Sequence, residues 1–223
     1  MGNMIQLASA DGHKFNAYRA EPNGKARGAL VVVQEIFGVN KHIKELADGF
    51  AAEGYLSIAP AFFERKEKNF DRGYTQADID AGRTIAMALD WNNTMKDLQV
   101  AIDNVKSAGK VGIIGYCWGG TTSWVAACRA NGLSCSLPFY GGGVANMTGE
   151  KPKVPVQFHW GHNDHAIPLA DVWKIEKEHP TAESYVYADA GHGFTCDHRG
   201  SYHEPSKILS RQRAIAFLHK HVG

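Results

Sequence analysis

The sequence has no excess of charge of either sign and no long apolar run. Its 223 residues carry 24 Lys and Arg against 23 Asp and Glu, a formal net charge of +1 at pH 7. A balanced and scattered charge argues against a nucleic-acid-binding protein or a membrane-surface protein. The longest apolar runs have the length of a strand and are too short for a helix that crosses a bilayer. We therefore expect neither nucleic acid nor a membrane among its partners.

Targeting signals and linkers are also missing. The first residues, MGNMIQLASADG, lack the basic head and apolar run of a signal peptide, and they lack the Ser or Thr of a myristoylation motif. These features predict a cytoplasmic protein, which we expect to be a monomer or a homodimer. Because no linker, repeat or low-complexity tract divides the chain, residues 1–223 are predicted to form a single domain with one sizeable core.

Cysteine is scarce, and its spacing excludes the common structural uses. None of the four cysteines forms a C-x-x-C pair, and a cytosolic chain keeps its thiols reduced. Cys128 and Cys135 lie in or beside apolar segments and are predicted to be inert core thiols. Cys117 is different because of the motif around it. The fourth thiol is Cys196.

The elements that are present alternate between strand and helix patterns. Short apolar or alternating runs predict strands, and apolar residues at helical spacing predict helices. Since Asp11-Gly12 joins the first two strands as a hairpin and the later strands are separated by helices, we expect an α/β fold. This is a doubly wound, mostly parallel sheet with an antiparallel hairpin at its N-terminal edge. The predicted strands are 4–7, 14–19, 29–34, 55–59, 111–114, 135–140, 154–160 and 183–187; the predicted helices are 40–53, 78–89, 94–107, 118–129, 169–178 and 206–219.

The most informative segment is 110–120, which reads KVGIIGYCWGG. An apolar strand turns there into a predicted helix, with Cys117 at the turn and Gly115 and Gly119 on either side. This is the pattern of the nucleophile elbow of α/β-hydrolases, with cysteine in place of the usual serine. The glycines are needed because a Cβ two positions before or after the strained apex would collide with the turn.

Two further reactive side chains follow strands of the predicted sheet. Asp164 comes after the strand 154–160, and His192 comes after the strand 183–187. Reactive groups gather at the carboxyl ends of parallel strands, and the order nucleophile, acid, histidine is that of α/β-hydrolases. The sequence therefore predicts a catalytic triad of Cys117, Asp164 and His192.

The predicted triad supplies what a thiol nucleophile needs. A free thiol has a pKa of about 8.5 and is only slightly ionised at neutral pH. His192 would take the proton, Asp164 would orient and favour the imidazolium, and the helix that starts after Cys117 would favour the thiolate. The backbone N–H groups of Trp118 and Ile36 are the expected oxyanion hole, each worth about 3 kcal/mol in the transition state.

Three segments together resemble the dienelactone hydrolase family. They are QEIFGVN at 34–40, GYCWGG at 115–120 and AGHGF at 190–194, in the family's order and over most of the chain. The resemblance implies a single α/β-hydrolase domain, a Cys-His-Asp triad and a covalent thioester intermediate. It also implies that Glu35 pairs with the resting thiol of Cys117 and helps to activate it when substrate arrives, which would guard the thiol from oxidation.

The sequence departs from the family at one informative position. The family's lactone hydrolases hold the substrate carboxylate with two arginines, one of them four residues after the triad histidine. Cys196 occupies that position here, and Arg199 follows three residues later. Arg83 corresponds loosely to the other arginine. We therefore take Arg83 and Arg199 as candidate substrate-binding residues, and the departure at Cys196 weakens the case for a carboxylate-bearing dienelactone as the substrate.

An aromatic pocket is expected around the elbow. Phe37, Trp160 and Phe194 are the candidate substrate-binding residues for its wall, together with Phe62, Phe63 and Trp118. Such a wall suits hydrophobic or aryl esters. The predicted protein is thus a cysteine-dependent hydrolase of a lactone or small aryl carboxylic ester. A thiolate in such a pocket is expected to attack other activated esters too, phosphotriesters included.

Three other readings are weaker. The eleven histidines match no zinc-binding spacing such as H-E-x-x-H, so we expect no metal and no other cofactor. A thiol-based redox protein would need a resolving cysteine near Cys117, and the next along the chain, Cys128, lies down the following helix. A non-catalytic binding protein on an α/β-hydrolase scaffold would have lost a triad residue, and none is lost.

Overall fold

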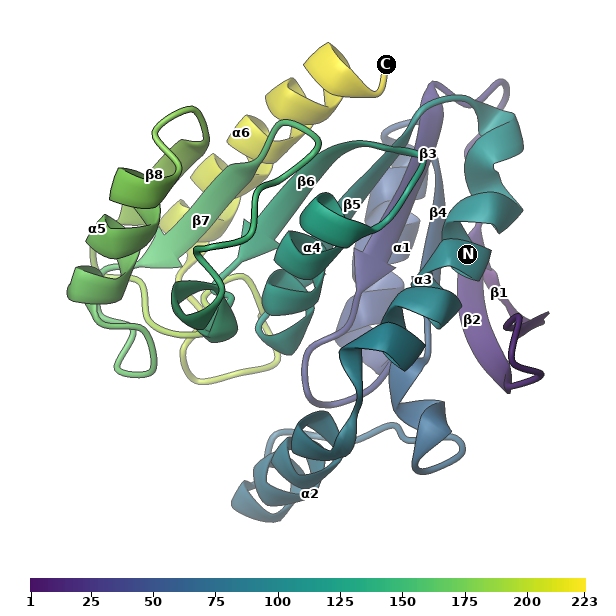
Figure 1. The fold of residues 1–223 in the computed structure, drawn as a ribbon, viewed down its shortest axis with the longest axis horizontal. Helices are drawn as coiled ribbons and strands as arrows, with labels where there is room; N and C mark the ends of the chain where they lie inside the picture. The colour runs from purple at the N-terminus through teal and green to yellow at the C-terminus, as the bar shows by residue number, and fades with distance from the viewer.

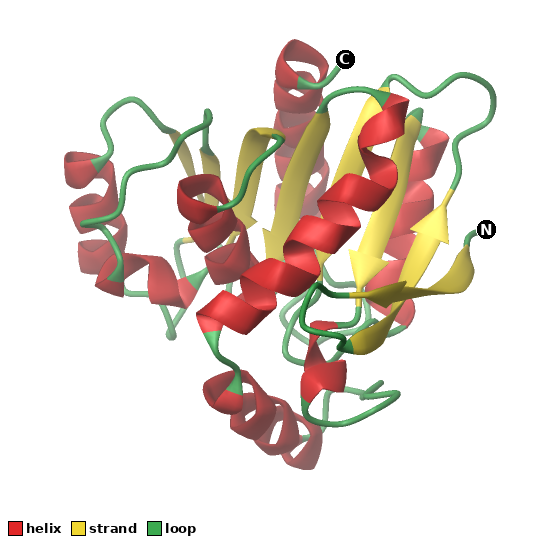
Figure 2. Cartoon of the chain, turned by 45° about the vertical axis from the view of Figure 1, so that its right-hand side comes forward, coloured by secondary structure: helices red, strands yellow, loops and turns green.

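A computed structural model describes residues 1–223 and contains one eight-stranded sheet covered by helices on both faces (Figures 1 and 2). The strands lie side by side in the order β1-β2-β4-β3-β5-β6-β7-β8. Their bounds are β1 Asn3–Ala8, β2 Lys14–Ala20, β3 Gly28–Val33, β4 Tyr55–Pro60, β5 Val111–Tyr116, β6 Leu133–Phe139, β7 Gln157–Gly161 and β8 Glu183–Tyr187.

The sheet has the predicted mixture of strand directions. β1 and β2 form an antiparallel hairpin, and β2 is antiparallel to β4. All remaining neighbours, from β4 through β3 to β8, are parallel. Every residue of β3 and β5 is buried, which explains why these strands read as continuous apolar runs. The predicted α/β-hydrolase fold class is confirmed.

Helices cover the two faces unequally. α1 (Lys41–Ala52) and α6 (Glu204–His221) lie behind the sheet in Figure 1, and α3 (Trp91–Val105), α4 (Trp118–Arg129) and α5 (Leu169–Glu178) lie in front of it. α2 (Gln76–Ala88) projects beyond the carboxyl ends of the strands, at the bottom of Figure 1. Short 3-10 turns occupy Phe62–Arg65, Lys106–Ala108 and Gly142–Asn146.

Local signals placed most element ends within one to three residues. The side chain of Asn40 caps α1 by accepting a hydrogen bond from the Ile43 N–H, as its position predicted. α2 starts earlier than expected because Thr75 and Asp78 form a capping box. The segment 60–75, expected to be a loop, contains the 3-10 turn Phe62–Arg65. None of the helices combines the length and the apolar character that a membrane crossing requires.

Candidate active site

Cys117 lies at a strained turn between β5 and α4. Its backbone has φ 57° and ψ −116°, a region that side chains rarely adopt. A Cβ on Gly115 would meet the Gly119 carbonyl, and one on Gly119 would meet the carbonyls of Val33 and Gln34. Glycine is therefore required at both positions, and the close packing fixes the apex cysteine at the amino end of α4.

Asp164 and His192 form a directed hydrogen bond beside the elbow. His192 Nδ1 lies 2.8 Å from Asp164 Oδ2, and Asp164 Oδ1 accepts a hydrogen bond from the Ala166 N–H at 2.8 Å. Asp164 is only 4% exposed. The aspartate thus fixes the ring so that Nδ1 donates to it, which leaves Nε2 for a reacting group.

The site favours a charged imidazole. Burial of His192 opposes the charge, but the Cys117 sulfur and the Asp164 carboxylate outweigh it and raise the pKa of His192 to about 10. The Tyr140 ring packs edge-on against the imidazole, with ring centroids 5.1 Å apart. A histidine that holds its proton beside a sulfur is what an imidazolium–thiolate pair requires.

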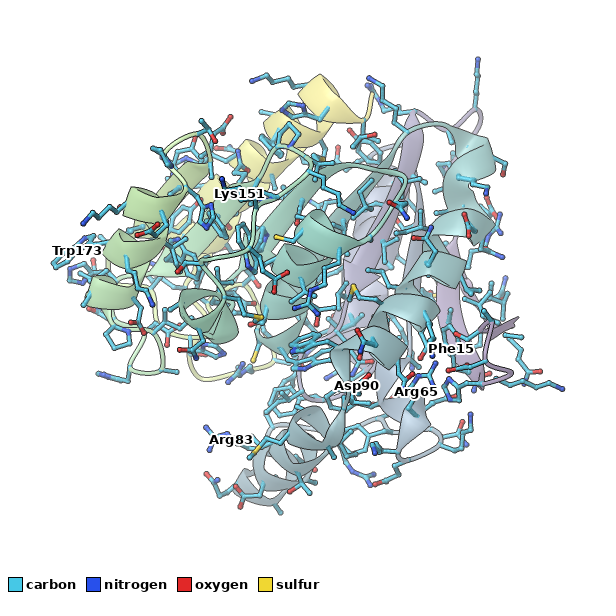
Figure 3. The ribbon with its side chains drawn as sticks, viewed as in Figure 1. Phe15, Arg65, Arg83, Asp90, Lys151 and Trp173 are labelled. Atoms are coloured by element: carbon cyan, nitrogen blue, oxygen red, sulfur yellow. The ribbon has the colours of Figure 1, made fainter.

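Cys117 and His192 open into one cleft with a volume of about 620 Å³. α2 and α3 form one wall of the cleft, and the elbow and the 3-10 turn Gly142–Asn146 form much of the other. Figure 3 shows the side chain of Arg83 extending from α2 on this side of the molecule. The cleft is lined by Ile36, Phe37, Ile79, Arg83, Ala86, Met87, Trp91, Cys117, Trp118, Thr121, Gly142, Gly143, Asn146, Met147, Ala166, Ile167, His192 and Arg199.

The expected oxyanion donors sit at this cleft. Trp118 is the first residue of α4, so its N–H is among the amides that have no acceptor within the helix. Ile36 follows the end of β3 and lines the same cleft as Cys117. Both residues therefore border the cleft that holds Cys117.

The aromatic wall differs in part from the expected one. Phe37 and Trp118 line the cleft, whereas Trp160 and Phe194 do not. Trp160 is buried, packs against Phe158 and donates its indole N–H to Ser184 Oγ. Phe194 is buried against Tyr140 and Tyr187, among other rings. The prediction that Trp160 and Phe194 face the substrate is wrong, because both rings complete the core beneath the site.

Apart from Arg83, sequence reasoning missed the cleft residues on α2 and at the start of α3. Trp91 stacks on Trp118 with ring centroids 6.0 Å apart and an 8° angle between planes. Ile79 and Met87 line the cleft beside it. The start of α3 at Trp91 has a local signal, because Asp90 caps the helix. The position of α2 across the carboxyl ends of the strands has no such signal, so the sequence did not show that these residues reach the cleft.

Glu35 has a different partner from the one expected. Its Oε1 accepts a hydrogen bond from Arg199 Nη1 at 3.1 Å, and the carboxylate is only 1% exposed. Arg199 therefore bridges the cleft and the buried Glu35, and its guanidinium also packs over the Phe37 ring. Cys196 is fully buried, and burial together with Glu35 raises the pKa of its thiol to about 11. The cysteine that replaces the family's arginine is thus a neutral thiol behind the cleft.

Known proteins share both the sequence pattern and the fold. The sequence profile of the dienelactone hydrolase family matches residues 15–222. The chain belongs to the dienelactone hydrolase family. A Synechocystis sp. relative, provisionally named a carboxymethylenebutenolidase, is 34% identical over 206 residues, which is 83% of each chain. The carboxymethylenebutenolidase of Pseudomonas putida is 28% identical over 224 residues, covering 96% of this chain and 94% of its own.

Solved structures agree with this placement in the dienelactone hydrolase family. A Klebsiella pneumoniae protein, provisionally named a dienelactone hydrolase, superposes with a TM-score of 0.84 at 27% identity, over 99% of this chain and 100% of its own. A dienelactone hydrolase-like promiscuous phosphotriesterase from metagenomic libraries has a TM-score of 0.82 at 20% identity, over 100% and 99% of the two chains. That second likeness concerns the fold. Membership of this family indicates that the protein is a hydrolase that acts on small molecules.

Proposed function

We propose that this hydrolase cleaves a lactone or small aryl carboxylic ester through Cys117, with His192 as base and Asp164 as the orienting acid. One observation carries the proposal: a cysteine at the apex of the elbow shares a cleft with a histidine that is hydrogen-bonded to a buried aspartate. The three side chains come from loops after β5, β7 and β8, and each has the chemistry that its step requires.

The first half of the reaction forms a thioester. The Cys117 thiolate attacks the ester carbonyl carbon, and the electron pair of the C=O bond moves onto the oxygen. The N–H groups of Ile36 and Trp118 hold this oxyanion. When the tetrahedral intermediate collapses, the C–O bond breaks, and the leaving alkoxide takes the proton from the His192 imidazolium.

The second half releases the acid. His192, now neutral, takes a proton from a water molecule, whose oxygen attacks the thioester carbonyl. Collapse of this second intermediate breaks the C–S bond, frees the carboxylic acid and restores the thiolate beside the imidazolium. Asp164 keeps the same hydrogen bond to Nδ1 throughout, because the ring gains and loses its proton at Nε2.

The cleft favours an apolar substrate. Trp91, Trp118, Phe37 and Met87 are the large apolar side chains beside Cys117 in the lining, and Arg83 and Arg199 supply the cationic groups. Arg199 is already paired with Glu35, which leaves Arg83 as the cation free of any ion pair. An aryl group stacked near Trp91 and Trp118 fits this distribution better than a strongly anionic substrate does. Activated phosphotriesters share an aryl leaving group, and we place them among the secondary substrates.

The test is a panel of p-nitrophenyl acetate, a dienelactone and an aryl phosphotriester with wild type, Cys117→Ala and His192→Ala. We expect both variants to lose at least about 1,000-fold in kcat on the carboxylic esters. Cys128→Ala is the matched control, since that thiol is buried away from the cleft, and it should keep the wild-type kcat. Wild-type turnover by Cys117→Ala would refute the mechanism.

A trapping experiment distinguishes the proposal from the redox and binding alternatives. With a slowly hydrolysed aryl ester, mass spectrometry should find the acyl group on the peptide that contains Cys117. The same adduct should accumulate further in His192→Gln if that variant still acylates, because deacylation needs the base. A protein that only binds esters or only undergoes thiol oxidation would give no acyl adduct.

A further inference from the structure

Three metal-binding side chains converge behind the cleft. One donor atom each from Glu35, His42 and Cys196 lies within 4.8 Å of the other two. The three residues are 1%, 2% and 0% exposed. The Oε2 atom of Glu35 and the Nε2 atom of His42 are buried without any hydrogen-bond partner. Two unpartnered polar atoms in one buried cluster are costly, and a ligand between them removes that cost.

We propose that Glu35, His42 and Cys196 form a binding site for Zn²⁺. A thiolate, an imidazole and a carboxylate are the ligand types that zinc takes in proteins, with bonds of about 2.0–2.3 Å. Tetrahedral bonds of that length place donor atoms about 3.3–3.8 Å apart, so the donor atoms need to approach one another by no more than about 1.5 Å to bind the ion. Binding forms a Zn–S bond at Cys196, and the displaced thiol proton goes to solvent.

The surrounding groups resemble the outer shell of a zinc site. His42 Nδ1 lies 4.0 Å from Asp197 Oδ1, so the ring presents Nδ1 to a carboxylate and Nε2 to the interior. Arg199 holds Glu35 Oε1 and leaves Oε2 unpartnered. The guanidinium of Arg199 orients the Glu35 carboxylate, and Asp197 adds a negative charge near the His42 ring. The thiol of Cys196 donates a hydrogen bond to the Tyr74 hydroxyl at 3.2 Å, and this bond is lost when the sulfur binds the ion as a thiolate.

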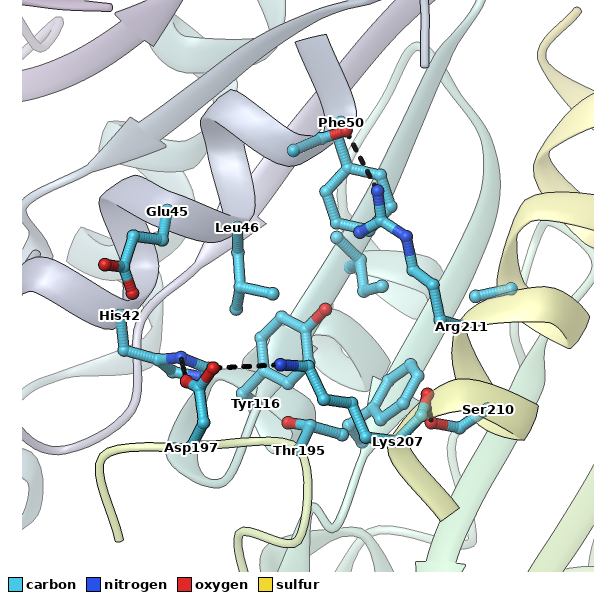
Figure 4. A pocket seen from close by; sticks show the side chains of 14 residues that line it. His42, Glu45, Leu46, Phe50, Tyr116, Thr195, Asp197, Lys207, Ser210 and Arg211 are labelled. Carbon is cyan, nitrogen blue, oxygen red and sulfur yellow. Dashed lines mark hydrogen bonds and ion pairs between the residues drawn. The ribbon is translucent and has the colours of Figure 1, made fainter. Parts of the chain in front are cut away.

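A second cavity reaches one of the three proposed ligands. It has a volume of about 220 Å³, lies between α1 and α6, and has His42 in its lining (Figure 4). Glu45 and Asp197 line the same cavity, and both carboxylates have a donor atom within 4.8 Å of His42. These exposed groups can bind a hydrated cation before it moves inward. Lys207, bonded to Asp197 at 3.1 Å, competes with the cation there and lowers the affinity.

The consequence for activity rests on the proposed function, whereas the binding itself does not. Glu35 is the carboxylate expected to help activate Cys117, and it follows β3 directly ahead of the oxyanion residue Ile36. A zinc ion on Oε2 fixes Glu35 beside His42 and Cys196. We therefore expect Zn²⁺ to inhibit ester hydrolysis by wild type, and a chelator to restore it.

The binding test uses Co²⁺ as a coloured substitute for Zn²⁺ in the full-length Cys117→Ala variant, which removes the thiol of the cleft. We expect one equivalent of Co²⁺ to produce a thiolate-to-cobalt charge-transfer band in the near ultraviolet, and Zn²⁺ to abolish it. Cys196→Ser should lose the band, and His42→Gln should lose at least about 100-fold in affinity. Asp197→Asn should lose about 10-fold, as outer-shell changes do.

Matched controls keep the result specific. Cys128→Ser and His219→Gln, a buried thiol and an exposed histidine away from the cluster, should keep the band in the same background. Circular dichroism shows whether each variant folds, and Cys196→Ala replaces Cys196→Ser if that variant fails. No band in Cys117→Ala overturns the site. A band that persists in folded Cys196→Ser or Cys196→Ala also overturns it, because the ion then binds elsewhere.

The two proposals fail separately. The band is measured in a variant that lacks the proposed nucleophile, so it does not depend on turnover. If Cys117→Ala binds Co²⁺ through Cys196 while wild type shows no thiol-dependent hydrolysis, the zinc site stands and the proposed function falls. If wild type hydrolyses esters through Cys117 and no band forms, the zinc site falls alone.

Discussion

The buried pair of Glu35 and Arg199 makes a quantitative prediction. Glu35 is only 1% exposed, and Arg199 is the only side chain that is hydrogen-bonded to its carboxylate. Arg199→Ala would leave this carboxylate without a partner. Removing one partner of a buried ion pair typically costs about 3–5 kcal/mol, because the other charge stays buried and unpaired. The Arg199 side chain is 17% exposed, so part of its charge is solvated already. We therefore expect the lower end, a loss of about 3 kcal/mol in the free energy of unfolding.

Thermal unfolding measures this loss. For a chain of this length each kcal/mol shifts Tm by about 2–4 °C, so Arg199→Ala should lower Tm by about 6–12 °C. Glu35→Gln removes the charge that needs a partner. The double variant should therefore regain most of the stability that Arg199→Ala loses. Arg83→Ala is the control, because Arg83 is exposed on α2 without an ion pair, and its effect should stay within about 0.5 kcal/mol.

Two results would refute this reasoning. The first is a drop in Tm for Arg199→Ala that is no larger than that for Arg83→Ala. The second is a double variant that melts no higher than Arg199→Ala, since the cost would then come from lost packing of the guanidinium on Phe37. Metal-free buffer with a chelator is used throughout, so that an ion at Glu35 cannot replace the missing arginine.

Three further predictions follow from the site. The pKa of His192 is raised from 6.5 to about 10, so its charged ring stabilises the fold fully below about pH 6.5, and this contribution is lost as the pH rises towards 10. Asp164→Asn should move the NMR titration midpoint of the ring to lower pH. An unmoved midpoint would contradict the assignment. Trp91→Ala should raise KM for aryl esters about fivefold, because about 1 kcal/mol of stacking with the substrate is lost. The kcat, and the KM for aliphatic esters, should change little. An equal rise in KM for aryl and aliphatic esters would count against an aryl subsite. Gly115→Ala should lower the free energy of unfolding by about 3 kcal/mol or more, as measured by urea denaturation, because the new Cβ meets the Gly119 carbonyl. A denaturation curve identical to that of wild type would disprove the tight elbow.

The elements and the order of the reactive residues could be predicted because their signals are local. A fully buried parallel strand reads as an unbroken apolar run, and the residue after it is held at one edge of the sheet. The position of Asp164 beside His192 could be predicted because each residue follows a strand of the same parallel sheet. The structure joins the two by a hydrogen bond of 2.8 Å. The glycines of the elbow follow from the turn in the same way, since the clash of an added Cβ is with neighbouring backbone.

The lining of the cleft could not be predicted because it depends on where helices pack. Trp160 lies in β7, where all five residues are buried because helices cover both faces of the sheet, so its side chain packs in the core. Trp91 faces the cleft because α2 lies across the strand ends and leads into α3, an arrangement with no sequence signature. Aromatic residues near strand ends thus identified the region of the site but not its surface.

Glu35 lies beside residues that line two different cavities. It is hydrogen-bonded to Arg199, which lines the cleft that holds Cys117, and it clusters with His42, which lines the cavity between α1 and α6. The family's arginine four residues after the histidine is Cys196 here, and Arg199 supplies a guanidinium to the cleft from three residues further on. That shift places a thiol where the family has a cation, directly beside the carboxylate. Cys196 therefore supplies one donor of the proposed zinc site and lies beside Glu35, so a change at Cys196 should affect ion binding and Glu35 together.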